Sequence, residues 1–207
     1  MYLSNEFNKK LCYNIHAERG IPMKEMIVLS DSHLHNDIVK NIIHRYPNIH
    51  ECIHCGDLQD DYHALSQLTH LTIVRGNNDF NDLPLIDFLS VSNHKIMICH
   101  GHYQNVEDTD YHLIEEAKTN KCNFICYGHT HDPTFYQREG IYILNPGSVA
   151  FPRGGHVFVP SYAIVLFEDV PIVNFYHAKT HECINHLVFE NIKQEKKSFF
   201  SFFKRKH

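Results

Sequence analysis

The segment Met26-Ile27-Val28-Leu29-Ser30-Asp31-Ser32-His33 joins an unbroken apolar run to two side chains that can bind a metal ion. A short continuous apolar run that ends in a turn is typical of a strand buried on both faces, as in a parallel sheet. Because open α/β sheets bind ligands at the carboxyl ends of their strands, this segment predicts both a fold class and the place of a site.

The first half of the chain alternates between strand-like and helix-like stretches. We expect strands at 25–30, 51–55 and 71–75, with helices at about 36–46 and 60–68 between them. This order is the β-α-β pattern of a parallel sheet.

The second half has fewer helix-like stretches. It predicts strands at 85–91, 95–99 and 123–127 and a helix around 109–120. Four short strands follow with little helix between them, which predicts a second, more antiparallel sheet; they are 134–137, 141–144, 162–167 and 172–177. We therefore expect an α/β fold in which two packed β-sheets are flanked by helices.

The composition suits one globular domain, since 43% of the 207 residues are apolar and 21% are charged. We expect an N-terminal extension over 1–22, the compact domain over 23–190 and a basic, aromatic tail over 191–207. The first twenty residues lack the apolar centre of a signal peptide, and no apolar stretch is long enough to span a bilayer. We therefore expect a cytoplasmic protein without an integral membrane segment.

The seven cysteines lie mostly in apolar runs, which favours reduced thiols in a core. Cys52 and Cys55 form a CxxC pair, but residues three apart in a strand point to opposite faces, so a structural role is expected. The net charge is −5, although the last fifteen residues carry +5. Because an acidic body repels polyanions, we expect a small phosphate compound as substrate and no stable nucleic-acid binding.

Five short motifs carry histidine, aspartate and asparagine side chains, each after a predicted strand. They are Asp31-Ser32-His33, Gly56-Asp57, Gly76-Asn77-Asn78-Asp79, His100-Gly101-His102 and Gly128-His129-Thr130-His131. Hard oxygens mixed with imidazole nitrogens suit manganese, iron, zinc or nickel held for hydrolysis. Two neighbouring cations need a shared ligand, and a carboxylate can bridge where a neutral imidazole cannot, so we expect Asp57 to be the bridge.

These motifs, with Asn145-Pro146-Gly147-Ser148-Val149 and Pro152-Arg153, resemble the motif set of the calcineurin-like metallophosphoesterases over about residues 26–178. The resemblance is strongest to the small YfcE-like phosphodiesterase branch. It implies a four-layer α/β/β/α sandwich. It also implies that Asp57 is shared between two ions, with Asp31, His33 and His131 on one and Asn77, His100 and His129 on the other.

The function implied by this resemblance is a dinuclear metal-dependent phosphodiesterase. It would hydrolyse small or nucleotide-like phosphodiesters by attack of a hydroxide that bridges the metals. The implied cofactors are two divalent ions, Mn²⁺ first and Ni²⁺, Zn²⁺, Fe²⁺ or Mg²⁺ as alternatives. A phosphomonoesterase, a dinucleoside polyphosphate hydrolase and a non-catalytic protein-binding scaffold like the related retromer subunit are the competing interpretations. Whether the chain forms a homo-oligomer is left open.

Several further residues have expected roles in this site. Many superfamily members carry a histidine at the position of Asn78 that protonates the leaving group, so His102 or a metal-bound water is expected to supply that proton here. A supporting role for His102 is the alternative. The expected catalytic residues are thus Asp57, Asn77 and His102.

Asn78 and Arg153 are expected to contact the substrate, because a guanidinium matches phosphate oxygens with paired donors. Arg153 could equally fix a turn. Asp79 is expected to orient a ligand imidazole rather than to bind a metal itself.

Overall fold

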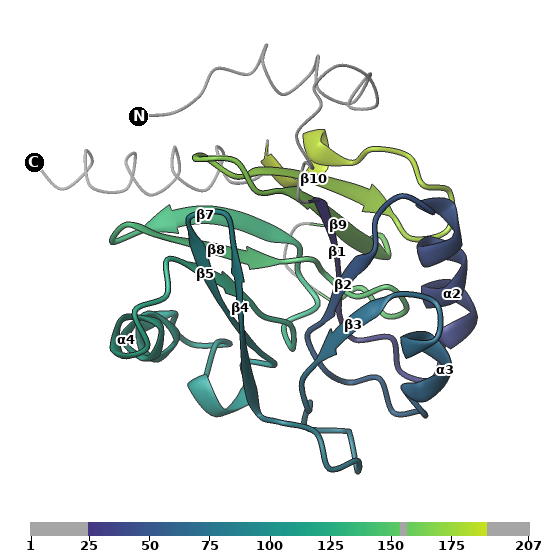
Figure 1. The fold of residues 1–207 in the computed structure, drawn as a ribbon, viewed down its shortest axis with the longest axis horizontal. Coiled ribbons are helices and arrows are strands. Elements are labelled where there is room, and N and C mark those ends of the chain that lie inside the picture. Colours follow the sequence, from purple (N-terminus) through teal and green to yellow (C-terminus); the bar gives the residue numbers. More distant parts are fainter. Residues whose placement is uncertain (1–24, 154–156, 190–207) are drawn as a thin grey trace, which may run out of the picture.

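The computed structural model describes residues 25–153 and 157–189, and Figure 1 shows its fold as a ribbon. The predicted extension over 1–22 and the predicted tail over 191–207 lie outside the described residues. These two boundaries therefore stay predictions.

The first sheet has five strands in the order β10-β9-β1-β2-β3. Its parallel strands are β1 (Glu25–Leu29), β2 (Glu51–His54) and β3 (His70–Ile73). Helices α2 (Asn36–Arg45) and α3 (His63–Ser66) connect them. The strands β9 (Ser161–Leu166) and β10 (Ile172–His177) complete the sheet, each antiparallel to its neighbour.

The second sheet has five strands in the order β4-β5-β6-β8-β7. Its parallel strands are β5 (His94–Cys99), β6 (Phe124–Cys126) and β8 (Ile141–Asn145). The edge strands β4 (Ile86–Val91) and β7 (Thr134–Arg138) run antiparallel to them. A short 3-10 turn, η1 (His102–Gln104), and helix α4 (Tyr111–Thr119) lie between β5 and β6.

The expectation that the four last strands form one sheet is wrong. β7 and β8 join β4–β6, whereas β9 and β10 extend the first sheet beyond β1. All six residues of β9 are buried, because β9 lies between two strands and is covered on both faces. The sequence pattern indicates that these segments are strands, but a short strand carries little information about its neighbour.

Alternate residues of β1 pack into different layers, as its continuous apolar run predicts. Met26 and Val28 pack between the two sheets, where Phe124 of β6 also lies. Ile27 and Leu29 pack on the other face against α2, and α4 covers the outer face of the second sheet. Figure 1 shows α2 and α4 on opposite sides of the pair of sheets. The four-layer α/β/β/α fold is therefore confirmed.

The structural interpretation of the CxxC pair is also confirmed. Cys52 packs on the α2 side of the first sheet and Cys55 packs between the sheets, so the two thiols face apart. The cysteines within the described residues are all free thiols. Among the helices in this part of the chain, none is long and apolar enough to cross a membrane.

Candidate metal centre

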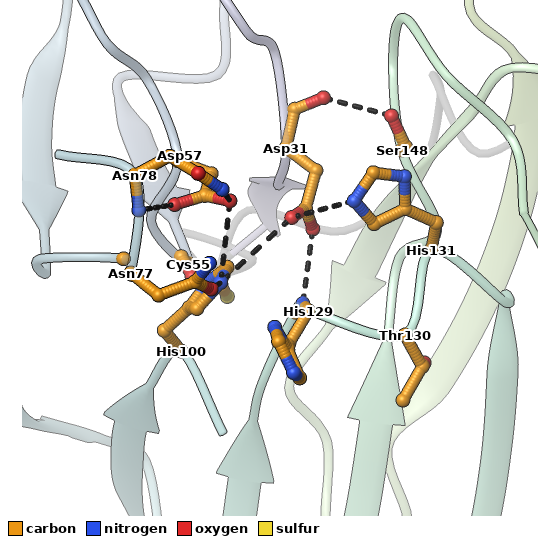
Figure 2. A network of polar contacts seen from close by, with 12 residues as sticks. Asp31, Cys55, Asp57, Asn77, Asn78, His100, His129, Thr130, His131 and Ser148 are labelled. Carbon is orange, nitrogen blue, oxygen red and sulfur yellow. Dashed lines mark hydrogen bonds and ion pairs between the residues drawn. The ribbon is translucent and has the colours of Figure 1, made fainter. Parts of the chain in front are cut away.

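The predicted ligands lie in loops that follow strands at one edge of both sheets. Asp31 and His33 follow β1, and Asp57 and Asn77 follow β2 and β3. From the second sheet, His100 follows β5, and His129 and His131 follow β6. Because the strands within each set are parallel, their carboxyl ends meet. Figure 2 shows the side chains of Asp31, Asp57, His100 and His131 turned toward one another.

Two clusters of ligand atoms form within this group, and both contain Asp31. One joins Asp31 with His33 and His131, and the other joins Asp31 with Asp57 and His100. In each cluster the ligand atoms lie within 4.8 Å of one another. Asp31 Oδ1 is 3.1 Å from Nε2 of His131 and 3.9 Å from Nε2 of His100. Its carboxylate therefore reaches both clusters.

Asp57 also lies between imidazoles of both clusters. Its Oδ2 atom is 3.8 Å from Nε2 of His33 and 3.5 Å from Nε2 of His100. Asn77 reaches the second cluster through its side-chain oxygen, which lies 3.0 Å from Nε2 of His100. The geometry thus gives two carboxylates, Asp31 and Asp57, that face both halves of the centre.

The three clustered imidazoles share one orientation. Nδ1 of His100 bonds the carbonyl oxygen of Cys55 at 2.7 Å, and Nδ1 of His131 bonds that of Phe151. Nδ1 of His33 lies 2.8 Å from the side-chain oxygen of Gln59. Since a carbonyl oxygen only accepts, these partners favour the tautomer in which Nδ1 carries the hydrogen and Nε2 is left to face the cluster. This is the tautomer that binds a metal ion.

The residues present fit divalent cations. Asp31 is fully buried, and its Oδ1 atom accepts no hydrogen bond although imidazole nitrogens surround it. Burial alone would raise the pKa of Asp31, but the positive charges that His131 and His100 can carry in the absence of a metal ion outweigh it and hold this pKa below its usual value. Ionised carboxylates and lone pairs that face one another repel, and a bound cation relieves that repulsion.

His129 lies beside these clusters and differs from the other imidazoles. Its backbone N–H donates to Asp31 Oδ2 at 3.1 Å, and its ring centroid is 5.1 Å from that of His100. Its Nε2 atom lies 3.4 Å from a carboxylate oxygen of Glu107. Of the seven predicted ligands, the structure thus brings six together through side-chain atoms and places the ring of His129 against His100.

The ligand loops hold strained backbone. Five predicted ligands have positive φ angles, namely Asp31, His33, Asp57, His129 and His131. Such conformations cost about 1–3 kcal/mol each for residues other than glycine, and they persist at functional sites. Glycine at 76 and 128 permits the close approach of these loops, because a Cβ atom on Gly76 would collide with Asp57 and one on Gly128 with Asp31.

Asp79 fixes the loop that carries Asp57, but through partners that differ from the prediction. It accepts hydrogen bonds from the backbone N–H groups of Asp57 at 2.8 Å, Gly76 at 2.8 Å and Gln59 at 2.6 Å. The expected partner was a ligand imidazole. The carboxylate instead orients backbone amides, because the third motif folds back over the second.

The two predicted substrate contacts lie against metal-ligand candidates. Asn78 donates to Asp57 through its backbone N–H at 2.8 Å and through its side chain at 2.6 Å. Arg153 is exposed, and its guanidinium lies 2.8 Å from Nε2 of His131 and 3.4 Å from the carbonyl oxygen of His129. Both side chains are therefore at the centre, with Asn78 directed at a ligand carboxylate.

His102 has an unusually low proton affinity. Burial and the positive charges that His100 and His129 can carry lower the pKa of His102 to about 4. Its Nδ1 atom is buried without a hydrogen-bond partner. An imidazole with this pKa is neutral at pH 7 and has no proton of suitable acidity to give to a leaving group. The structure therefore favours the supporting role over that of general acid.

Sequence reasoning missed two residues that position ligands. Gln59 bonds His33 as described above, and its only sequence signal is its place two residues after Asp57. Ser148 donates from its hydroxyl to the carbonyl oxygen of Asp31 at 2.7 Å and accepts from the N–H of Phe151 at 2.8 Å. Ser148 was visible as part of the motif Asn145–Val149, but its role depends on contacts across the two sheets.

Comparison with known proteins is consistent with this site. The calcineurin-like phosphoesterase superfamily domain matches residues 23–169. The chain is 31% identical over 162 residues to the probable metallophosphoesterase YsnB of Bacillus subtilis, which covers 76% of this chain and 93% of that protein. It is 32% identical over 102 residues to the phosphodiesterase YfcE of Escherichia coli, covering 44% of this chain and 52% of that protein.

Solved structures show the same fold. A conserved protein from Streptococcus pneumoniae, described as a predicted phosphoesterase, superposes with a TM-score of 0.73 at 29% identity and covers 81% of this chain and 97% of its own. Vps29 from Entamoeba histolytica, a single mutant, superposes with a TM-score of 0.65 at 23% identity and covers 77% and 97%. The second likeness concerns the fold alone.

Proposed function

Because the chain belongs to the calcineurin-like phosphoesterase superfamily, we propose that it is a dinuclear metal-dependent phosphodiesterase acting on small or nucleotide-like phosphodiesters. The observation that carries this proposal is the pair of ligand clusters that share Asp31 at the common edge of both sheets. Two adjacent clusters of oxygen and imidazole ligands are what a two-ion centre requires.

The residues of the centre divide into those that hold ions and those that hold ligands. Asp31, His33 and His131 would hold one ion, and Asn77, His100 and His129 the other, with Asp57 between them. When bound, the two ions would lower the pKa of an attacking water and neutralise charge on the phosphoryl oxygens. Asn78 and Asp79 fix the loop and carboxylate of Asp57, as their hydrogen bonds indicate.

Arg153 would contact the substrate itself, whereas His102 would act through a neighbouring ligand. Arg153 is exposed at the centre, so its guanidinium can turn from His131 to phosphate oxygens. His102 would support the neighbouring ligand His100, whose ring centroid is 5.3 Å away. Since His102 is neutral at pH 7, the leaving group would take its proton from water. A substrate with a good leaving group needs least help at this step.

Exposed apolar side chains around the motifs support a diester over a monoester. Leu34, Phe80 and Tyr103 each directly follow a motif residue, and they are 64%, 97% and 65% exposed. Phe151 is 49% exposed, and its ring centroid lies 5.5 Å from that of His33. A diester carries an organic group on each side of the phosphorus, and such groups gain from apolar contact. That YfcE is named a phosphodiesterase agrees with this choice.

A phosphomonoesterase and a dinucleoside polyphosphate hydrolase remain the alternatives within the same chemistry. A protein-binding scaffold is the alternative from another class, and the likeness in fold to Vps29 is the observation that favours it. Every predicted ligand position here holds a residue competent to bind a metal. This complete set of candidate ligands supports an enzymatic function over a non-catalytic scaffold.

The finer expectations rest on general chemistry. Mn²⁺ is proposed as the first metal to test, because mixed carboxylate, amide and imidazole ligands suit it, although availability also decides which ion is bound. The cytoplasm is proposed as the location from the free, mostly buried thiols of the described residues. No oligomeric state is proposed.

Substrate profiling tests the proposal. Metal-free protein would be assayed with bis(p-nitrophenyl) phosphate and with p-nitrophenyl phosphate, with Mn²⁺, Ni²⁺, Zn²⁺ and Mg²⁺ added back in turn. We expect metal-dependent turnover that favours the diester. A preference for the monoester would replace the phosphodiesterase with a phosphomonoesterase. Folded protein that binds two ions but turns over neither compound would favour the scaffold.

A further inference from the structure

Each clustered imidazole of the centre is held through the nitrogen that faces away from the cluster. For His33, His100 and His131 this nitrogen is Nδ1, and its partner is an uncharged amide or backbone carbonyl oxygen. Such partners fix the tautomer and the ring orientation of a metal ligand, and they influence its basicity. The outward partner of an imidazole is therefore part of the metal site.

His129 is held differently from these three. Its Nε2 atom lies 3.4 Å from Oε1 of Glu107, so its outward partner is a carboxylate. With Nε2 directed at an acceptor, Nδ1 is the nitrogen left for a metal ion. We propose that Glu107 is a positioning residue for the second ion, which orients the His129 ring and raises its basicity through a carboxylate–histidine–metal arrangement. This inference rests on the proposed dinuclear function.

The loop that carries Glu107 is anchored on both sides. On one side, the backbone N–H groups of Asp108 and Thr109 donate to the carbonyl oxygen of Asn105 at 3.1 and 3.3 Å. On the other side, Asp110 pairs with Arg138 of β7 at 2.5 Å. These contacts bind residues 105–110 to one another and to the second sheet. Glu107 is thus presented to His129 from a fixed loop.

Because Glu107 is exposed, its role in positioning His129 can be tested separately from any role in folding stability. Its side chain is 65% exposed, and ion pairs in such positions contribute little to stability. The same contact can still matter for metal binding, because loss of an outer partner of a ligand histidine typically weakens metal affinity or activity about 10- to 100-fold. A variant at 107 is therefore expected to fold normally and to bind metal poorly.

Asp108 provides a matched control. It is the next residue on the same loop, carries the same charge and is exposed, but its carboxylate bonds Asn105 rather than a histidine. Glu107→Gln and Asp108→Asn each remove one negative charge from adjacent positions of the same loop. A general electrostatic effect would weaken metal binding in both variants, whereas the positioning role concerns Glu107 alone.

The test is calorimetric titration of Mn²⁺ into the metal-free full chain, for the parent and both variants. Thermal unfolding of the metal-free proteins is measured alongside. We expect Glu107→Gln to bind one ion as the parent does and the other about tenfold more weakly. Asp108→Asn should bind both ions with parental affinity, and the three metal-free proteins should unfold at the same temperature.

Three results would overturn the inference. Parental affinity for both ions in Glu107→Gln would remove the role of Glu107 and leave the dinuclear centre intact. An equal loss in Asp108→Asn would reduce the effect to general charge. A parent protein that binds a single ion would contradict the dinuclear proposal itself, and with it a second ion for Glu107 to serve.

Discussion

The two sheets contribute different chemistry to the metal centre. The first sheet supplies the oxygen ligands, which are Asp31, Asp57 and Asn77, together with the imidazole of His33. Among the predicted ligands, the second sheet supplies imidazoles alone, which are His100, His129 and His131. Neither set is a complete site by itself, so the centre exists only where the sheets pack together.

This division explains how the parts depend on each other. Buried carboxylates need positive charge nearby, and the imidazoles of the second sheet are neutral when they serve as ligands. A bound cation would therefore balance the charge of the carboxylates from the first sheet, and the imidazoles of the second sheet would complete its coordination. We expect substitutions of oxygen ligands to cost more than substitutions of imidazoles, because a lost carboxylate also removes a charge that attracts the ion.

Replacing the central carboxylate of the first sheet should have the largest effect. Asp57→Asn keeps the shape of the side chain but removes its charge, and we expect at least about a 1000-fold loss of diester turnover because both ions lose a ligand. Steady-state kinetics at saturating Mn²⁺ measures this loss. Asp31→Asn offers a direct comparison, since Asp31 also faces both halves. An Asp57→Asn enzyme with parental activity would contradict the bridging role.

Removing an imidazole of the second sheet should cost less. His100→Gln is expected to lose one of two ions and about 100-fold in turnover, because the carboxylates still hold the other ion. Metal analysis after gel filtration counts the ions. His112→Gln is the control, since this histidine is exposed on α4, a helix that carries no predicted ligand. If His100→Gln lost both ions, the two sheets would contribute equally to each ion.

Metal binding should stabilise the folded protein, to which both sheets contribute candidate ligands. At a Mn²⁺ concentration 100 times its Kd, one bound ion stabilises the folded state by about 2.7 kcal/mol. For a domain of this size we expect the Tm to rise by about 5–11 °C over the value in a chelator. Calorimetry with and without Mn²⁺ measures the shift. An unchanged Tm would mean that the folded protein does not bind Mn²⁺ in preference to the unfolded chain.

A further effect, confined to acidic pH, concerns His54 at the end of β2. Burial lowers the pKa of His54 to about 4, from an unfolded value of 6.5. Between these values the unfolded chain binds the extra proton, so stability falls as the pH falls and stays constant above pH 6.5 as far as this group is concerned. The expected slope is about 1.4 kcal/mol per pH unit.

Chemical unfolding of the metal-free protein between pH 6.5 and 4 measures this slope. His54→Gln removes this titrating group and leaves the other groups unchanged. The unfolding free energy of the variant should therefore fall less steeply with pH, by about 1.4 kcal/mol per pH unit. Equal slopes in parent and variant would show that His54 is protonated in the folded protein.

Within the first sheet, the parallel strands β1–β3 were easier to predict from the sequence than the antiparallel strands β9 and β10. Continuous apolar runs such as Met26–Leu29 indicate buried strands, and a polar motif after each run indicates the ligand edge. The assignment of β9 failed because its pairing with β1 is a contact between distant parts of the chain. Local pattern indicates that a strand exists but not which strand is its neighbour.

The same limit applies inside the site. Candidate ligands such as Asp31 and His131 could be proposed from the sequence because metal chemistry restricts ligands to a few residue types, and the structure brings these two side chains together. The residues that orient these side chains could not be identified from the sequence. Gln59 lies in a turn with a positive φ, Ser148 bonds Asp31 between the sheets, and Glu107 approaches His129 from another loop. The neutral state of His102 likewise follows from burial and neighbours that its motif does not reveal.

The central claim is that two ions, held jointly by both sheets, make the enzyme active. The most direct test is a titration of metal-free protein with Mn²⁺, in which hydrolysis of bis(p-nitrophenyl) phosphate is measured against the ions bound per chain. The account predicts little turnover with one ion and full turnover only as the second binds. Full activity with one bound ion, or none with two, would contradict it.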